Sequence, residues 1–310
     1  RGTAVTREGK RMPTVTADDL IARVGFNTAS LPDRALREAL SEGAALGLRC
    51  VELLAFEGYH HTAGELAGMF FDRLSPDERD LLRNLVADFE HVSVHAPFWD
   101  VAPFAANPTT REATRAQLLR TVEVAGEVGA DTVTTHVIPR VGRSLEEFCG
   151  DVIDFYRRLG DAGAEAGVTV TIETGYPAGI DEFAALIAAI DHEAVGANVD
   201  VGHLRGLLPE GDRTPDALPG AYNELLRRHL RSLGDRIYHV HLHDVLVEGV
   251  RDHRECGTGV IDYEAIFRAL LAQDYAGLMM FELEEPEAAG ALRRSRDVIS
   301  GAIRRAAASV

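Results

Sequence analysis

The feature that most constrains the fold of this chain is a strand-sized segment that recurs along it and ends each time in a polar residue. Six such segments end 27 to 41 residues apart, in His95, His136, Glu173, Asp200, His241 and Glu282. Between them, apolar residues recur at the helical period of about 3.6 residues, as in helices that cover one face of a sheet. Strands that alternate with helices are typical of βαβ units and a parallel sheet.

The alternation predicts an α/β fold, specifically a (β/α)8 TIM barrel. Two further strands are expected at 23–27 and 48–54, which gives eight units in 310 residues. Eight units fit a closed barrel better than an open sheet, whose commonest forms have about five or six strands. Residues 1–18 are charged and rich in threonine, so we expect an N-terminal extension there and a single barrel domain over 19–310. Helices are expected at about 32–46, 65–71, 110–129, 144–166, 181–190, 215–233, 262–273 and 286–307, and one more begins after Ser75.

The polar strand ends are expected at the carboxyl-terminal mouth of the barrel, where barrel enzymes carry their chemistry. Four of them form a set of three carboxylates and one imidazole: Glu173, Asp200, His241 and Glu282. Carboxylates packed together repel one another and raise each other's pKa, so the set is costly without a cation. Oxygen ligands with one imidazole suit Mn²⁺, Mg²⁺, Co²⁺ or Fe²⁺, and Zn²⁺ is compatible. The sequence therefore predicts one divalent metal ion.

Other polar residues near the strand ends are expected to contact the substrate. They are His203, His95, His136, His253 and Arg251. At strand period His239, His241 and His243 share one face, and a hydrogen-bonded position in the core is the expected fate of His239. His253 lies on a polar loop and fits a ligand or a solvated surface equally well. The other cations near strand ends, Arg140, Arg205 and Arg254, are expected to be surface charges more often than substrate contacts.

Composition excludes several classes of function. The net charge of −17 argues against a nucleic-acid or anionic-membrane surface, because phosphates are held by clustered Lys and Arg. The three cysteines form no Cys-x-x-Cys pair, which indicates a reducing compartment and a cytoplasmic protein. No apolar run is long enough to cross a membrane.

Several motifs resemble those of the xylose isomerase-like barrels from about residue 23 to residue 300. They are Ser93-Val-His-Ala-Pro97, Ile172-Glu173, Asp200-Val-Gly-His203, His241-Leu-His-Asp244, Gly257-Thr-Gly-Val-Ile-Asp262 and Phe281-Glu282. This family includes sugar and sugar-phosphate isomerases and epimerases, inosose dehydratases and the endonuclease IV class of DNA-repair enzymes. The resemblance implies that Glu173, Asp200, His241 and Glu282 hold one divalent metal and that His203 touches the substrate. It also implies that the protein can form a homo-oligomer, since subunits of family members often pair near the active-site face.

These observations predict a metal-dependent isomerase or epimerase acting on a polyhydroxylated small molecule such as a sugar, keto-sugar or cyclitol. In the expected mechanism the metal polarises a carbonyl, Glu173 or Glu282 removes the proton beside it, and the other carboxylate returns one. A lyase or dehydratase that uses the same site stays open, because an acid such as His203 could instead protonate a β-leaving group.

The resemblance also leaves a second class open, a multi-zinc phosphodiesterase. Endonuclease IV enzymes hold three zincs with the four residues above and those matching His95, His136, His203 and His253. Arg251 stands where those enzymes have an aspartate, and Asp252 is displaced by one position. That cation and the net charge of −17 count against this class.

Overall fold

The structure, a computed structural model, describes residues 15–309. Residues 1–14, most of the predicted extension, lie outside the described residues. Helix α1 (Ala17–Ala22) begins inside the range predicted as extension. It begins there because the Thr16 hydroxyl accepts the backbone N–H of Asp19 and the Asp19 carboxylate accepts that of Thr16.

Eight parallel strands close into a barrel in the order β1-β12-β9-β8-β7-β6-β5-β2. They are β1 (Val24–Asn27), β2 (Cys50–Leu54), β5 (His91–His95), β6 (Thr132–Thr135), β7 (Thr169–Glu173), β8 (Val195–Asp200), β9 (Ile237–Leu242) and β12 (Leu278–Phe281). The predicted (β/α)8 barrel is confirmed, and each predicted strand end falls on or directly after the last residues of its strand. The polar ends therefore meet at one mouth of the barrel.

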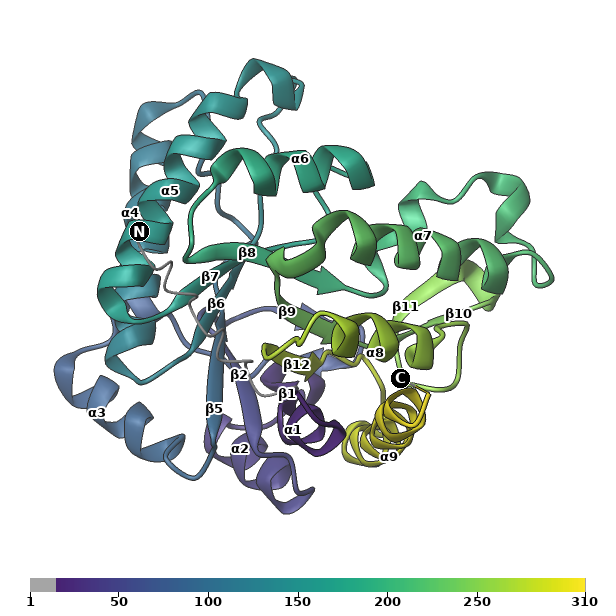
Figure 1. Ribbon diagram of the computed structural model, residues 1–310. Helices are drawn as coiled ribbons and strands as arrows, with labels where there is room; N and C mark the ends of the chain where they lie inside the picture. The colour runs from purple at the N-terminus through teal and green to yellow at the C-terminus, as the bar shows by residue number, and fades with distance from the viewer. Residues whose placement is uncertain (1–14, 310) are drawn as a thin grey trace, which may run out of the picture.

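Helices surround the barrel on its outer face (Figure 1). Besides α1 they are α2 (Leu36–Ala45), α3 (Pro76–Leu85), α4 (Pro108–Glu127), α5 (Cys149–Ala166), α6 (Ile180–Ile190), α7 (Leu218–Leu233), α8 (Tyr263–Ala272) and α9 (Ala288–Ala307). Strand residues that point outward, such as Val199, Val240 and Phe281, are fully buried beneath them. The main apolar core thus lies between strands and helices, and a small separate cluster of Cys50, Leu278 and Met280 packs on the inner side of the strands, below the polar residues.

Local sequence explains where elements begin. The predicted start at Ser75 is confirmed, because its hydroxyl accepts the N–H of Glu78 and Pro76 occupies the first turn of α3. The predicted helix over 65–71 is wrong. That segment holds strand β4 (Gly64–Glu65), which pairs with β3 (His60–His61), and then runs beside β2, where Met69 N–H donates to the carbonyl of Leu54 at 3.1 Å. This pairing outweighs the weak helical periodicity.

The motif after the histidine strand forms a clamp at the mouth. Strand β10 (Asp244–Leu246) pairs with β11 (Arg251–Arg254) beside α7 (Figure 1). The buried Asp244 carboxylate accepts the backbone N–H groups of Val245, Gly257 and Ile261 at 2.8, 2.8 and 3.1 Å. Gly259 is required there because a Cβ would lie 2.2 Å from the carbonyl oxygen of Val245.

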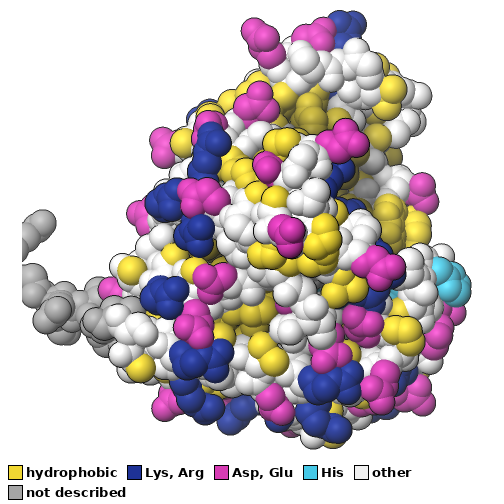
Figure 2. All heavy atoms as spheres, turned by 90° about the vertical axis from the view of Figure 1, so that its right-hand side faces the viewer, with side chains coloured by type: hydrophobic (Ala, Val, Ile, Leu, Met, Phe, Trp, Pro, Cys, Tyr) yellow, Lys and Arg dark blue, Asp and Glu magenta, His cyan; other side chains and the backbone are white. Residues whose placement is uncertain are grey.

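Acidic and basic side chains are interspersed on the face shown in Figure 2. Among the described residues, no helix has the length and apolar character needed to span a membrane.

Candidate functional site

The four residues predicted as a metal-binding set converge at the mouth of the barrel. Glu173 and Asp200 end β7 and β8, His241 lies near the end of β9, and Glu282 directly follows β12. These four strands are neighbours in the barrel. One potential ligand atom from each residue lies within 4.8 Å of all the others.

The Nδ1 atom of His241 faces the three carboxylates. It lies 3.2 Å from Glu173 Oε2, 3.0 Å from Glu282 Oε2 and 3.7 Å from Asp200 Oδ2. Nδ1 is buried, and its geometry fits a hydrogen bond to none of these oxygens. A buried nitrogen without a hydrogen bond, facing three carboxylates, is the donor set expected around a divalent cation. The residues present therefore fit such an ion.

Hydrogen bonds from the surrounding chain orient the Asp200 carboxylate. His243 Nε2 lies 2.9 and 3.0 Å from its two oxygens, and Oδ1 also accepts the N–H groups of Gly202 and His203 at 2.8 and 3.0 Å. His243 Nδ1 accepts the backbone N–H of His253 at 2.9 Å, so Nε2 carries the proton that it donates to Asp200. Burial alone would raise the pKa of Asp200, but His203 and His243 hold it well below its ordinary value. The carboxylate is thus kept ionised and fixed in direction.

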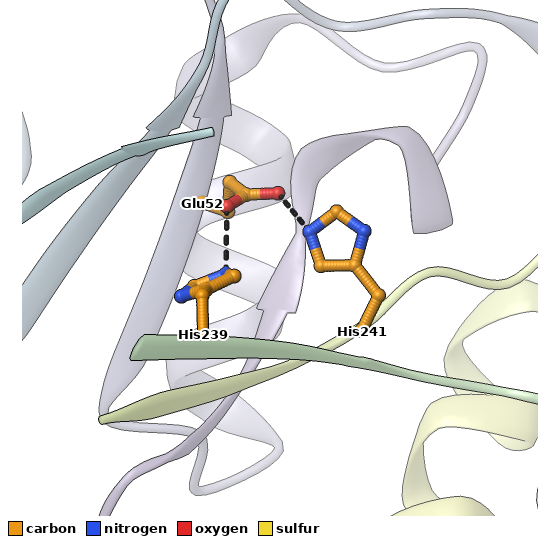
Figure 3. A group of neighbouring side chains, drawn as sticks. All are labelled: Glu52, His239 and His241. Carbon is orange, nitrogen blue, oxygen red and sulfur yellow. Dashed lines mark hydrogen bonds and ion pairs between the residues drawn. The ribbon is translucent and has the colours of Figure 1, made fainter. Parts of the chain in front are cut away.

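Glu52, in the middle of β2, belongs to the site although the sequence did not single it out. Its side chain is fully buried inside the barrel, and its oxygens lie 2.9 Å from His241 Nε2 and 3.0 Å from His239 Nε2 (Figure 3). Burial would raise the pKa of Glu52, but His241 and His239 hold it well below its ordinary value. His239 lies in the core beside this carboxylate, as expected, but the predicted hydrogen bond is not formed, because the geometry fits one at neither ring nitrogen.

His95 and His136 extend the set toward β5 and β6. Their Nε2 atoms lie 3.3 Å apart, and each is 3.4 Å from Glu173 Oε2. His95 Nδ1 donates to the carbonyl of Ala96 at 2.9 Å, which leaves Nε2 for the site. Burial lowers the pKa of His136 to about 4, so this imidazole is neutral at pH 7.

His203 and His253 approach from the opposite side. His203 Nδ1 donates to the carbonyl of Thr174 at 2.9 Å and lies 3.2 Å from Glu173 Oε1. Burial would lower the pKa of His203, but the carboxylates of Asp200 and Glu173 raise it to about 10. His253 stacks on His243 with ring centroids 4.3 Å apart, and its Nε2 lies 3.8 Å from Glu282 Oε2.

A cavity of about 170 Å³ opens onto these residues. Of the four-residue set only Glu173 and Glu282 line it, together with His95, His136, His203 and His253. The other wall is apolar and includes Phe56, Phe98 and Trp99, which the sequence analysis did not identify. Phe98 and Trp99 pack with ring centroids 4.4 Å apart, and Trp99 is 36% exposed.

The expected cations do not line this cavity. Arg251 is exposed on β11, so the structure does not bring it to the other predicted substrate contacts. The remaining cations near the strand ends are already in ion pairs: Arg140 with Asp151, Arg205 with Asp252 and Arg254 with Glu285. Within residues 15–309 the cavity wall therefore has histidines but neither lysine nor arginine.

Comparison with known proteins places this arrangement in a family. A sequence model described as the xylose isomerase-like TIM barrel matches residues 40–301. The chain belongs to this family. An inosose dehydratase from Geobacillus thermodenitrificans is 31% identical over 156 residues, which span 44% of this chain and 47% of that relative. The alignment thus covers about half the length of the curated relative.

Solved structures share the whole fold of this xylose isomerase-like barrel. A D-tagatose 3-epimerase-like protein has a TM-score of 0.70 at 19% identity, covering 93% of this chain and 99% of that one. A Mycobacterium smegmatis xylose isomerase-like barrel in complex with magnesium has a TM-score of 0.69 at 18% identity, with coverages of 94% and 99%. An L-ribulose 3-epimerase has a TM-score of 0.69 at 16% identity, with coverages of 93% and 96%. At these identities the similarity shows the fold.

Proposed function

We propose that this chain is a divalent-metal-dependent isomerase or epimerase that acts on a small polyhydroxylated carbonyl compound, a sugar, keto-sugar or cyclitol. One observation carries the proposal. Of the four residues that converge on one point, the two glutamates, Glu173 and Glu282, are also the two that open onto the cavity. The names of the similar proteins, which include sugar epimerases and an inosose dehydratase, support the same chemistry.

Glu173, Asp200, His241 and Glu282 would hold the ion, for which Mn²⁺, Mg²⁺, Co²⁺ or Fe²⁺ suits this mixture of oxygen and nitrogen donors. Bound there, the ion would supply Lewis-acid polarisation of the substrate carbonyl and so acidify the neighbouring C–H. The residues of the chain supply the proton transfers.

Glu173 and Glu282 are suited to act as a pair of bases. They reach the cavity from β7 and β12, which are separated in the barrel by β8 and β9. A substrate between them presents opposite faces of one carbon, so one carboxylate removes a proton and the other returns one, which inverts the centre.

Histidines and aromatic rings define what the cavity accepts. His95, His136, His203 and His253 offer ring nitrogens to hydroxyl groups. The C–H face of a sugar ring suits the apolar wall at Phe98 and Trp99. If His203 protonates a leaving group after the first proton transfer, the same site performs dehydration or another β-elimination.

Proton abstraction can be tested without knowing the final product. Wild-type enzyme with Mg²⁺ or Mn²⁺ is incubated in D₂O with a panel of ketoses, 3-keto-glucosides and inososes, and deuterium uptake beside the carbonyl is measured by mass spectrometry and, with Mg²⁺, by NMR. We expect uptake with at least one compound and its loss, by at least about 100-fold, in Glu173→Gln and Glu282→Gln. Glu287→Gln, at an exposed position outside both the cavity and the ion set, is the control and should retain uptake. A folded Glu282→Gln variant with wild-type exchange would defeat the proposal.

A second candidate, a multi-zinc phosphodiesterase, is favoured by a different observation. Three more groups converge at the mouth beside the set: His95 with His136 and Glu173, Asp200 with His243 and His253, and His203 with Asp252 and His253. Asp252 Oδ1 lies 3.3 Å from His253 Nδ1 although the sequence displaces this aspartate by one position. Arg205 forms an ion pair with the same oxygen at 2.8 Å, and the cation counts against a metal there, although Oδ2 of Asp252 is buried without a hydrogen-bond partner. About one metal ion per chain by elemental analysis supports the isomerase, whereas two or three zincs with cleavage of abasic duplex DNA support the phosphodiesterase.

A further inference from the structure

We propose that Glu52 is a positioning residue of the ion site: its carboxylate fixes the tautomer and direction of His241, so that Nδ1 is presented to the metal ion. The inference rests on the proposed function, because it assumes that an ion binds at the four-residue set. It concerns a residue that lies beneath that set and does not touch the cavity.

The position of Glu52 suits an anchor. Its carboxylate lies inside the barrel between the rings of His239 and His241, both carried by β9 (Figure 3). Oε1 accepts the side-chain N–H of Asn27 at 2.8 Å, and Oε2 accepts the hydroxyl of Ser93 at 2.9 Å. The carboxylate is therefore tied to β1 and β5 as well as to β9, and it cannot follow His241 if that ring turns.

The hydrogen bond to Glu52 determines which nitrogen of His241 is free. An ionised carboxylate only accepts hydrogen bonds, so His241 Nε2, 2.9 Å from Glu52 Oε1, must carry a proton. With an ion bound in place of the second proton, the imidazole has one N–H, so the lone pair that faces the ion is on Nδ1. Nδ1 is the nitrogen that faces Glu173, Asp200 and Glu282. A carboxylate that orients the far nitrogen of a ligating histidine typically strengthens metal binding.

Glu52, His239 and His241 also converge closely enough to be considered as a second metal site. The hydrogen bonds count against that role. Glu52 Oε1 accepts from Asn27 and His241, Oε2 accepts from the hydroxyls of Ser93 and Thr134, and all three residues of the group are fully buried. A carboxylate with this shell of donors holds imidazoles in place and has no free direction for a cation.

His239 provides the matched comparison. Its Nε2 lies 3.0 Å from Glu52 Oε2, one strand repeat deeper than His241, but the geometry fits a hydrogen bond at neither of its ring nitrogens. A change at His239 therefore perturbs the same buried layer without removing the bond that orients His241. A general packing defect would affect both positions, whereas a role in orienting His241 is specific to Glu52.

The test is Mn²⁺ affinity, measured by calorimetry and by water-proton relaxation on metal-free wild type, Glu52→Gln and His239→Gln, each checked for folding by circular dichroism. We expect binding about 10- to 100-fold weaker in Glu52→Gln and within about threefold of wild type in His239→Gln. Equal affinity of wild type and folded Glu52→Gln would overturn the role of Glu52 alone. Equal loss in both variants would also overturn it, since it would show a packing effect. Failure of wild type to bind any Mn²⁺ would overturn the proposed function, and this inference with it.

A second measurement needs no variant and decides the question if Glu52→Gln does not fold. Wild-type protein with ¹⁵N-labelled histidine is saturated with Mg²⁺ or Zn²⁺, and long-range ¹H–¹⁵N spectra assign the tautomer of each ring. We expect His241 to carry its proton on Nε2 with Nδ1 free of hydrogen. A proton on Nδ1 of the metal-loaded protein would refute the inference.

Discussion

Acidification should destabilise this protein through one imidazole outside the ion set, His229. His229 lies on α7 and is fully buried, with Nε2 2.9 Å from the hydroxyl of Thr174 and Nδ1 without a partner. Its ring packs against Phe183, with centroids 5.5 Å apart. Burial therefore lowers the pKa of His229 to about 4. Protonation would place a charge on a nitrogen that no acceptor faces.

The size of the effect follows from this pKa. An unfolded histidine has a pKa of about 6.5, so below that pH the unfolded chain binds a proton that the folded chain does not. The neutral His229 ring makes its full contribution to the free energy of unfolding above about pH 6.5. That contribution is lost progressively as the pH falls and stops changing near pH 4, where the folded protein also becomes protonated. At about 1.36 kcal/mol for each tenfold change in proton affinity, the loss between pH 7.5 and pH 5 is about 2 kcal/mol.

The assay is urea unfolding at pH 7.5 and pH 5 in the presence of a chelator, followed by circular dichroism. From pH 7.5 to pH 5 the free energy of unfolding of wild type should fall by about 2 kcal/mol more than that of His229→Gln. In this variant the glutamine amide can still donate to Thr174 but cannot titrate. His60→Gln, at an exposed position, is the control and should follow wild type. The same pH dependence in wild type and His229→Gln would refute the reasoning.

Two further predictions concern folding and thiol reactivity. Gly259→Ala should lower the free energy of unfolding by about 1–3 kcal/mol in urea titrations, because its Cβ would meet the Val245 carbonyl, whereas Gly211→Ala, with no atom nearby, should change it little. Iodoacetamide at pH 7.5 should label native protein at Cys149 only, as checked by mass spectrometry, because burial raises the pKa of the Cys50 and Cys256 thiols to about 12. Rapid labelling of all three native thiols would contradict this.

The barrel and the four-residue set were accessible from sequence because both depend on local, repeated patterns. The alternation of polar and apolar residues along each strand indicates which side chains face inward. The parallel arrangement brings the carboxyl ends of the strands together. The sequence alone therefore groups Glu173, Asp200, His241 and Glu282. Their role as ligands stays a proposal, as do the oligomeric state and the cytoplasmic location.

Glu52 could not be predicted as a site residue in the same way, because it lies at the middle of its strand. The rule that polar strand ends face the mouth of the barrel does not apply to a residue one layer deeper. A signal was nevertheless present, since a single carboxylate among the apolar residues of Cys50–Leu54 is costly to bury without partners. Those partners, His239 and His241, lie almost two hundred residues later in the chain, and no local pattern connects them.

Loops account for the rest of what the sequence analysis missed. Phe98 and Trp99 follow β5 without periodicity, and Arg251 was assigned to the substrate from chain proximity alone. The displaced Asp252 is a further case. The Asp252 carboxylate lies beside His203 and His253 despite the one-residue offset. The pairing of β10 with β11 is irregular in register here, and His253 has a φ of 55°. Such backbone conformations depend on tertiary contacts and are not visible in residue spacing.

The cavity has two halves with separate origins in the chain. The ion set comes from β7, β8, β9 and β12, all in the second half of the sequence, whereas Phe56, Phe98 and Trp99 follow β2 and β5 in the first half. Mutation of the loops after β2 and β5 can therefore alter which molecules enter while the reactive carboxylates keep their supports. For an engineer these loops are the place to build a combinatorial library, and for evolution they are a region where substrate preference can diverge among paralogues that keep one chemistry.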